Sequence, residues 1–143
     1  GLHFNLSDSG EMAVYALGGG APLGVDIEAR RDISDARQLA ARHFSPAERE
    51  WLRQRPADEA ADAFLRCWAC KEAVVKALGD GLTTPLAAFT AAHWQQPARL
   101  LWVDGLDRSW TICLLSPPSG YVAALASSAA IDALEEHQLL FDA

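Results

Sequence analysis

The stretch WACKEAVVK, residues 68–76, lies inside the longest helical pattern of the chain. This pattern begins at Asp58 and ends near Gly79, where a glycine is typical of a helix terminus. At about 100° per residue, large apolar side chains fall within one arc of the helix. They are Phe64, Trp68, Val75 and Leu78. The spacing therefore predicts a long helix with one buried face.

Charged residues interrupt this arc. Lys71 falls inside it, and Glu72 lies at its border, four residues before Lys76. A lysine among apolar neighbours either extends its ammonium to the edge of the interface or is required where the helix meets an anion. A Glu–Lys pair at this spacing stabilises a helix by only about 0.3–0.5 kcal/mol and needs no function to explain it. Both interpretations stay open at this point.

The second informative stretch is LGVDIE, residues 23–28, in which apolar and acidic residues alternate at the end of the run. Successive side chains of a strand point to opposite faces, so Asp26 and Glu28 share one face. Their positions are about 7 Å apart along the strand, close enough to share a hard divalent cation. Alternating polar residues are also common on a solvated strand face, so this pair alone does not establish a metal site.

Shorter patterns precede the long helix. Strands are predicted over residues 4–7 and 12–17. Helices are predicted over residues 34–43 and 46–54, the second with Ser45 as its N-cap and Pro46 at its first position.

Beyond Pro85 the pattern changes to a period of two. It predicts strands over residues 99–103, 109–115 and 121–126, separated by turn signals at 104–105 and 117–120. This order favours an antiparallel meander, followed by a final helix over residues 131–140. The expected fold class is α+β, an antiparallel sheet packed against a long helix, and 143 residues suit a single domain.

The charge distribution excludes some functions. The formal net charge is −7, which argues against a general nucleic-acid binder, because neutralising phosphates requires clustered basic residues. Ten of the twelve basic residues lie within residues 30–76, so an anionic ligand or partner is expected there. No run of about 18 apolar residues predicts a membrane span.

The cysteines favour a structural role. Three cysteines in a chain with an adequate core do not suggest a disulfide framework, so we expect a cytoplasmic protein. Cys67 and Cys70 have the CxxC spacing of redox sites, but they lie well inside the helical pattern. A redox thiolate is typically stabilised at a helix N-terminus, so these cysteines are interpreted as core residues.

Taken together, GVDIE at residues 24–28 and WACKEAVVK at residues 68–76 resemble the signature of the 4'-phosphopantetheinyl transferases. Three flanking segments strengthen the resemblance to the surfactin-synthetase-activating class of this superfamily. They are FNLSDSG at residues 4–10, FSPAE at residues 44–48 and the segment from Gly79 to Phe89. The resemblance covers residues 4–89.

This resemblance implies magnesium-dependent transfer of the phosphopantetheine arm from coenzyme A to a serine of an acyl or peptidyl carrier protein. It implies that Asp26, Glu28 and Glu72 hold the metal, while Lys71 and Lys76 neutralise phosphate charge.

Further roles follow from the flanking motifs. Ser7 and Ser9 would donate hydrogen bonds to coenzyme A. Glu48 and Glu72 are the alternative bases for the serine hydroxyl, and the sequence does not choose between them.

Two departures from the family define the alternatives. Asp8 stands where the motif carries a histidine that contacts coenzyme A, so a catalytically silent module that binds coenzyme A or a carrier protein is a second hypothesis. The class is also built from two fused halves, and the chain corresponds to the second half. We therefore expect part of a larger transferase, with self-association or a separate N-terminal chain as alternatives.

Overall fold

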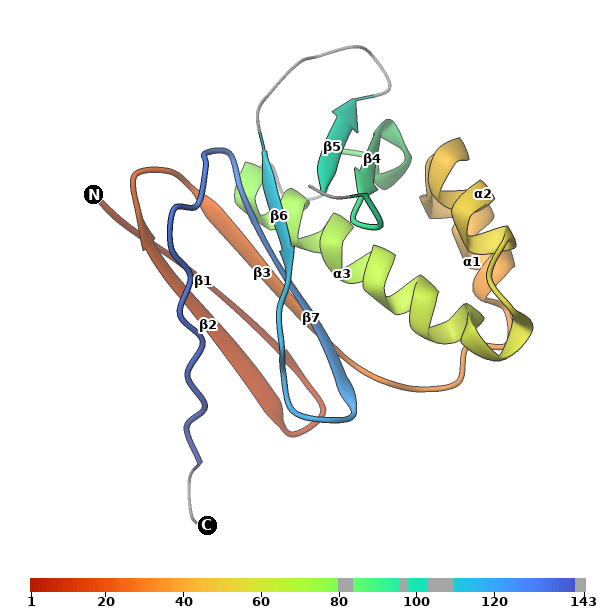
Figure 1. Ribbon diagram of the computed structural model, residues 1–143, viewed down its shortest axis with the longest axis horizontal. Helices are drawn as coiled ribbons and strands as arrows, with labels where there is room; N and C mark the ends of the chain where they lie inside the picture. The colour runs from red at the N-terminus through yellow and green to blue at the C-terminus, as the bar shows by residue number, and fades with distance from the viewer. Residues whose placement is uncertain (80–83, 96–97, 103–109, 141–143) are drawn as a thin grey trace.

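The computed structural model describes residues 1–79, 84–95, 98–102 and 110–140 (Figure 1). Its centre is a three-stranded antiparallel sheet in the order β3-β7-β6. The strands are β3 (Leu23–Ala29), β6 (Thr111–Leu114) and β7 (Tyr121–Ser127). Asp26 lies opposite Ala124 in the register of β3 and β7.

Helix α3 (Ala60–Leu78) packs on β3 and β7, as Figure 1 shows. Small residues permit this contact, because β7 presents the buried residues Ala124 and Ala126 on the face that bears Gly24 and Asp26. Gly24 marks the closest approach. A Cβ at this position would lie 2.0 Å from the carbonyl oxygen of Ala73, so no larger residue fits without moving the helix.

Helices α1 (Ala36–His43) and α2 (Pro46–Arg53) pack against α3. The start of α2 follows the sequence prediction, with Ser45 as N-cap and Pro46 in the first turn. Ser45 and Glu48 form a capping box, in which each side chain accepts a hydrogen bond from the other residue's backbone N–H. A short 3-10 helix, η1 (Ala57–Glu59), precedes α3.

Two antiparallel hairpins complete the described structure. The first pairs β1 (Leu2–Ser9) with β2 (Met12–Gly19), and it lies beside β3. The second pairs β4 (Phe89–Ala92) with β5 (Arg99–Trp102), and a 3-10 helix, η3 (Leu86–Ala88), leads into it. The α+β fold class and the long helix are thus confirmed, with α3 ending at Gly79 in the left-handed conformation.

The sequence prediction of the C-terminal region is partly wrong. β5 pairs with β4 rather than joining a meander, and β4 was missed because FTAA is buried throughout and shows no alternation. Residues 131–140 form no helix. Leu139 and Leu140 in that segment are exposed, and a short helix without a packed face is marginal in water.

Some sequence predictions lie outside the described residues. They concern the turn at 104–105, parts of the strands predicted over 99–103 and 109–115, and residues 80–83 of the segment that follows the long helix. Within the described residues, no helix is both long enough and apolar enough to cross a membrane.

We predict that Gly24→Ala lowers the free energy of unfolding by about 1–3 kcal/mol, because the added Cβ meets backbone atoms of α3 that cannot rotate away. Urea denaturation measures this effect. Gly19→Ala is the matched control, since Gly19 also lies in a strand but a Cβ there would meet only the Gly1 carbonyl oxygen at 4.0 Å, an ordinary contact, and a change below about 1 kcal/mol is expected there. Equal effects of the two substitutions would contradict the close contact.

Candidate active site

Asp26 is the centre of the candidate site. Its side chain is buried in the middle of β3, and its Oδ1 atom accepts a hydrogen bond from Ser7 Oγ at 3.2 Å. Lys76 Nζ reaches the same atom from α3 at 3.1 Å and also donates to the carbonyl oxygen of Val25. The structure therefore brings together a strand carboxylate and a helix lysine that are fifty residues apart in the sequence.

Glu28 lies two residues further along β3 on the same face. Burial, and next the negative charge of Asp26, raise the pKa of the Glu28 carboxyl to about 7. Arg31 opposes this shift from 3.6 Å. Sequence reasoning did not assign Arg31 to the site, because it lies beyond the strand and belongs to none of the motifs.

Glu72 lies on α3, and the charge of Asp26 acts on it. Burial, followed by the negative charge of Asp26, raises the pKa of the Glu72 carboxyl, whereas Lys76 lowers it. The negative charge of Asp26 thus acts on both Glu28 and Glu72, and Lys76 is bound to Asp26 itself. The cluster concentrates negative charge where β3 meets α3.

Within the described part of the chain, no group of three His, Cys, Asp or Glu side chains is arranged closely enough to hold a metal ion. The donor set nevertheless suits a hard cation, because carboxylate oxygens are the ligands that magnesium prefers. Asp26 Oδ2 is buried and has no hydrogen-bond partner among the described residues. A buried carboxylate oxygen without a donor costs free energy, and a cation would supply the missing contact.

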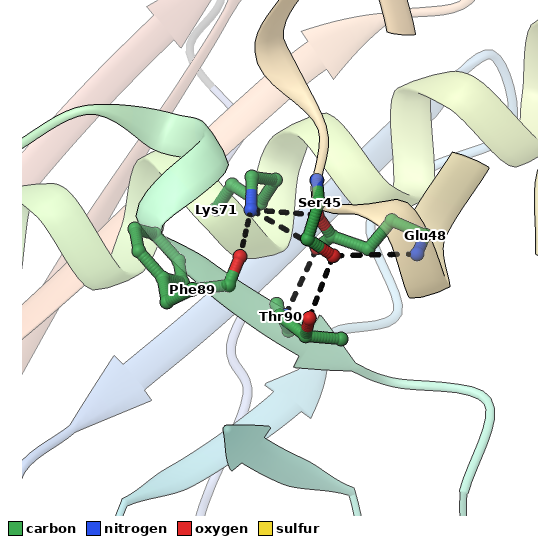
Figure 2. Close-up of polar contacts among 6 residues, drawn as sticks. Ser45, Glu48, Lys71, Phe89 and Thr90 are labelled. Carbon is green, nitrogen blue, oxygen red and sulfur yellow. Dashed lines mark hydrogen bonds and ion pairs between the residues drawn. The ribbon is translucent and has the colours of Figure 1, made fainter. Parts of the chain in front are cut away.

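Glu48 and Lys71 form a second, separate cluster (Figure 2). Lys71 Nζ donates to Glu48 Oε1 at 2.7 Å and to the carbonyl oxygen of Phe89 at 2.6 Å. Glu48 also accepts hydrogen bonds from the backbone N–H groups of Ser45 and Ala91. The pair thus connects α2, α3 and β4.

This cluster changes the interpretation of both residues. Neither side chain has any exposed surface, and Lys71 also lies 4.1 Å from the centre of the Phe89 ring. Burial lowers the pKa of Lys71, but the negative charge of Glu48 opposes that shift. In this structure the anion that Lys71 meets is Glu48 itself, so the geometry does not support a phosphate contact for Lys71 or proton transfer by Glu48.

Ser7 and Ser9 also differ from the sequence expectation. Both hydroxyl oxygens accept hydrogen bonds from backbone N–H groups of β3, Ser7 from Ile27 and Ser9 from Ala29. They therefore face the interior of the fold rather than a ligand. Asp8, between them, is exposed on the opposite face of β1.

The cysteines are core residues, as the sequence predicted. Cys67 and Cys70 are fully buried, and burial raises the pKa of both thiols well above the usual value. The negative charge of Glu48 acts in the same direction. Both thiols therefore stay protonated, which is unsuited to redox chemistry.

Comparison with known proteins decides the family. The family model of the 4'-phosphopantetheinyl transferase superfamily matches residues 22–126, which include β3, α3 and β7 up to its last residue but one. The chain belongs to the 4'-phosphopantetheinyl transferase superfamily.

Curated members of the superfamily share substantial identity with the chain. It is 38% identical over 126 residues to 4'-phosphopantetheinyl transferase HetI of Nostoc sp., covering 88% of this chain and 52% of HetI. It is 39% identical over 88 residues to 4'-phosphopantetheinyl transferase Sfp of Bacillus subtilis, covering 62% of this chain and 38% of Sfp. The chain thus spans about half the length of HetI and less of Sfp.

Solved structures of the superfamily share the fold. A holo-(acyl-carrier-protein) synthase from Bacillus anthracis, solved in complex with CoA (3',5'-ADP), superposes with a TM-score of 0.60 at 16% identity. That match covers 75% of this chain and 94% of the synthase. The holo-[acyl-carrier-protein] synthase of Thermotoga maritima gives a TM-score of 0.58 at 18% identity, covering 75% of this chain and 62% of that one.

We predict that Lys71→Met lowers the free energy of unfolding by about 3–5 kcal/mol, because it leaves the buried carboxylate of Glu48 without its counter-charge. Denaturant unfolding followed by circular dichroism measures the loss. Combining Lys71→Met with Glu48→Gln is expected to recover part of it, since the uncompensated charge is then removed.

The surface pair of Arg53 and Glu50 on the neighbouring helix provides the control for this experiment. Both side chains are at least half exposed, so Arg53→Met is expected to change stability by less than about 1 kcal/mol. If Lys71→Met were equally mild, the buried pair would not be the contact that fixes α2 and β4 to α3.

Proposed function

We propose that the chain carries the metal- and phosphate-binding part of a 4'-phosphopantetheinyl transferase, which moves 4'-phosphopantetheine from coenzyme A to a serine of an acyl or peptidyl carrier protein. The observation that carries this proposal is the convergence of Asp26, Glu28, Glu72 and Lys76 where β3 meets α3. Family membership and the free cysteines fit such an enzyme in a reducing compartment such as the cytoplasm.

In this proposal Asp26, Glu28 and Glu72 hold Mg²⁺. When bound, the ion would balance the charge of the coenzyme A pyrophosphate, which is the main requirement of phosphoryl transfer. The unpartnered Asp26 Oδ2 supports this assignment, because it is a buried acceptor without a donor, and the Glu28 pKa of about 7 shows that burial and the Asp26 charge disfavour a second negative charge unless a cation offsets it.

Lys76 is the cation proposed to contact phosphate. Its side chain is 29% exposed, in contrast to the fully buried Lys71. The ammonium binds Asp26 and the Val25 carbonyl, and these contacts fix its position at the surface of the cluster. A lysine held in this way acts as a point charge on a phosphate oxygen.

The transfer itself requires a base. The carrier serine oxygen attacks the phosphorus that bears the pantetheine arm, the bond to the departing oxygen breaks, and adenosine 3',5'-bisphosphate leaves. The serine proton has to pass to a carboxylate within hydrogen-bond reach or through one water. Of the two candidates from the sequence, we favour Glu72, because its side chain is only partly buried, whereas Glu48 is fully buried and paired with Lys71.

We predict that Glu72→Ala slows transfer on the order of 100-fold or more, because a group that stabilises the transition state is lost. The assay mixes the full-length gene product with an apo carrier protein, coenzyme A and MgCl₂, and follows the mass of the carrier protein. Adenosine 3',5'-bisphosphate should appear at the same rate as the modified carrier.

Glu135→Ala is the control, because Glu135 is 84% exposed and lies far along the chain from the cluster, and it should leave the rate unchanged. Coenzyme A binding without any transfer by the unmodified protein would instead favour the silent binding module, which the exposed Asp8 keeps under consideration. A fully active Glu72→Ala variant would remove Glu72 from the site.

We further propose that the chain is one half of a longer transferase and that the other half packs on the β1–β2 hairpin. One face of this hairpin is apolar and exposed, and it consists of Leu2, Phe4, Leu6, Tyr15 and Leu17. A contiguous apolar face of this kind marks an interaction site. The greater length of HetI and Sfp supports a further segment of a longer protein, which we propose to precede the chain, as its partner.

Cysteine labelling tests this arrangement. Leu17→Cys is expected to react with a maleimide at the rate of a free thiol in the chain alone, and at least 10-fold more slowly in a longer protein that includes the preceding segment. Leu139→Cys is the matched control, because Leu139 is 76% exposed and Leu17 71%. Slow labelling of Leu17→Cys in the chain alone would indicate self-association through the hairpin instead.

A further inference from the structure

The backbone hydrogen-bonding groups along the two edges of β3 find different kinds of partner. One edge forms the backbone ladder with β7, and the other faces β1. On that second edge the backbone N–H groups donate to side chains instead of to a strand backbone. The bonds are Val25 N–H to Asn5 Oδ1 (3.0 Å), Ile27 N–H to Ser7 Oγ (3.2 Å) and Ala29 N–H to Ser9 Oγ (2.9 Å).

The equal spacing of donors and acceptors explains this side-chain ladder. Alternate residues of β1 point to one face, and alternate N–H groups of an edge strand point outward. Three polar residues at positions 5, 7 and 9 therefore match three N–H groups of β3 in register. The ladder docks the hairpin and leaves these N–H groups of the edge paired.

Ser7 makes a second side-chain contact, which Asn5 and Ser9 do not make in the described structure. Its Oγ atom lies 3.2 Å from Asp26 Oδ1. The direction of both bonds is fixed, because the Ile27 N–H can only donate and an ionised carboxylate can only accept. Ser7 therefore accepts from Ile27 with a lone pair and gives its own proton to Asp26.

This contact determines which carboxylate oxygen of Asp26 has no hydrogen-bond donor. Ser7 and Lys76 both donate to Oδ1, while Oδ2 is buried without a hydrogen-bond partner among the described residues. A carboxylate held by two donors at one oxygen cannot rotate freely about its terminal bond. The free oxygen is consequently held in one direction.

We infer that Ser7 is a positioning residue, which orients Asp26 so that Oδ2 is presented to a divalent cation. This inference rests on the proposed magnesium site. It gives Ser7 a role different from the coenzyme A contact expected from the motif, because the hydroxyl proton is already given to Asp26. Groups that orient a metal-binding carboxylate contribute to affinity without touching the ion.

Ser9 supplies a matched comparison for the experiment. Ser7→Ala and Ser9→Ala each remove one rung of the ladder, but only Ser7→Ala removes a contact to a carboxylate. We propose to titrate MnCl₂ into the full chain and to count free Mn²⁺ by electron paramagnetic resonance. Manganese takes the same oxygen ligands as magnesium. Thermal unfolding of each variant gives its folded fraction.

We expect Ser7→Ala to weaken Mn²⁺ binding by about 10-fold or more, and Ser9→Ala by less than about 2-fold, at a temperature where both are folded. A purely structural role for Ser7 predicts similar losses of thermal stability in both variants with equal affinity for Mn²⁺, and that result would overturn the inference while leaving the metal site intact. No saturable Mn²⁺ binding by the unmodified chain would overturn the proposed site and the inference together.

A second variant, Ser7→Cys, tests the inference if Ser7→Ala does not fold. Ser7→Cys keeps a side chain of similar shape, but a thiol is a weak donor and a weak acceptor. It should fold and still bind Mn²⁺ more weakly than the unmodified chain. Affinity equal to that of the unmodified chain would show that the hydrogen bond to Asp26 is not required.

Discussion

The buried ion pair of Lys71 and Glu48 is the contact on which the arrangement of α3 depends. Moving two charges out of water is costly, and the cost is offset here because each charged group is also hydrogen-bonded to backbone atoms. Glu48 caps its own helix with the same carboxylate that receives Lys71. The pair therefore fixes the rotation of α3 about its axis relative to α2 and β4. Any other rotation would leave a charge buried without a partner.

That rotation decides where the neighbouring residues point. Successive residues of a helix are about 100° apart, so holding Lys71 in the interior turns Glu72 and Lys76 away from it and toward β3. The close contact between Gly24 and Ala73 sets the distance between helix and strand. Rotation and distance together allow the Lys76 ammonium to reach the carboxylate of Asp26. The structural lysine and the proposed catalytic residues are thus adjacent in sequence but separate in space.

Local signals in the sequence were sufficient to predict most helices and strands, whereas contacts between distant residues could not be predicted from it. Ser45 and Gly79 mark helix ends through interactions within a few residues, and both predictions are confirmed. The predicted arc was only partly right, because Trp68, Val75 and Leu78 are half-buried and α3 is buried on more than one face. The partner of Lys71 lies twenty-three residues away, and no periodicity reveals it. The contact of Ser7 with Asp26 is hidden for the same reason. The helix predicted for residues 131–140 fails because helical spacing does not guarantee a surface on which to pack.

The acidic groups at β3 carry a cost in folding free energy, and the proposed cation site would account for it. Burial and mutual repulsion raise the pKa of Glu28 to about 7, which means that the folded protein holds a proton there that the unfolded chain would release at neutral pH. Folding near pH 7 is therefore penalised at this residue, and the penalty grows as the pH rises through that value. A fold selected only for stability would replace one of these carboxylates with an apolar residue. Acidic side chains at the boundary between a rigid strand and a rigid helix suit the proposed cation site, because charged ligands on rigid elements are already oriented when a hard cation binds.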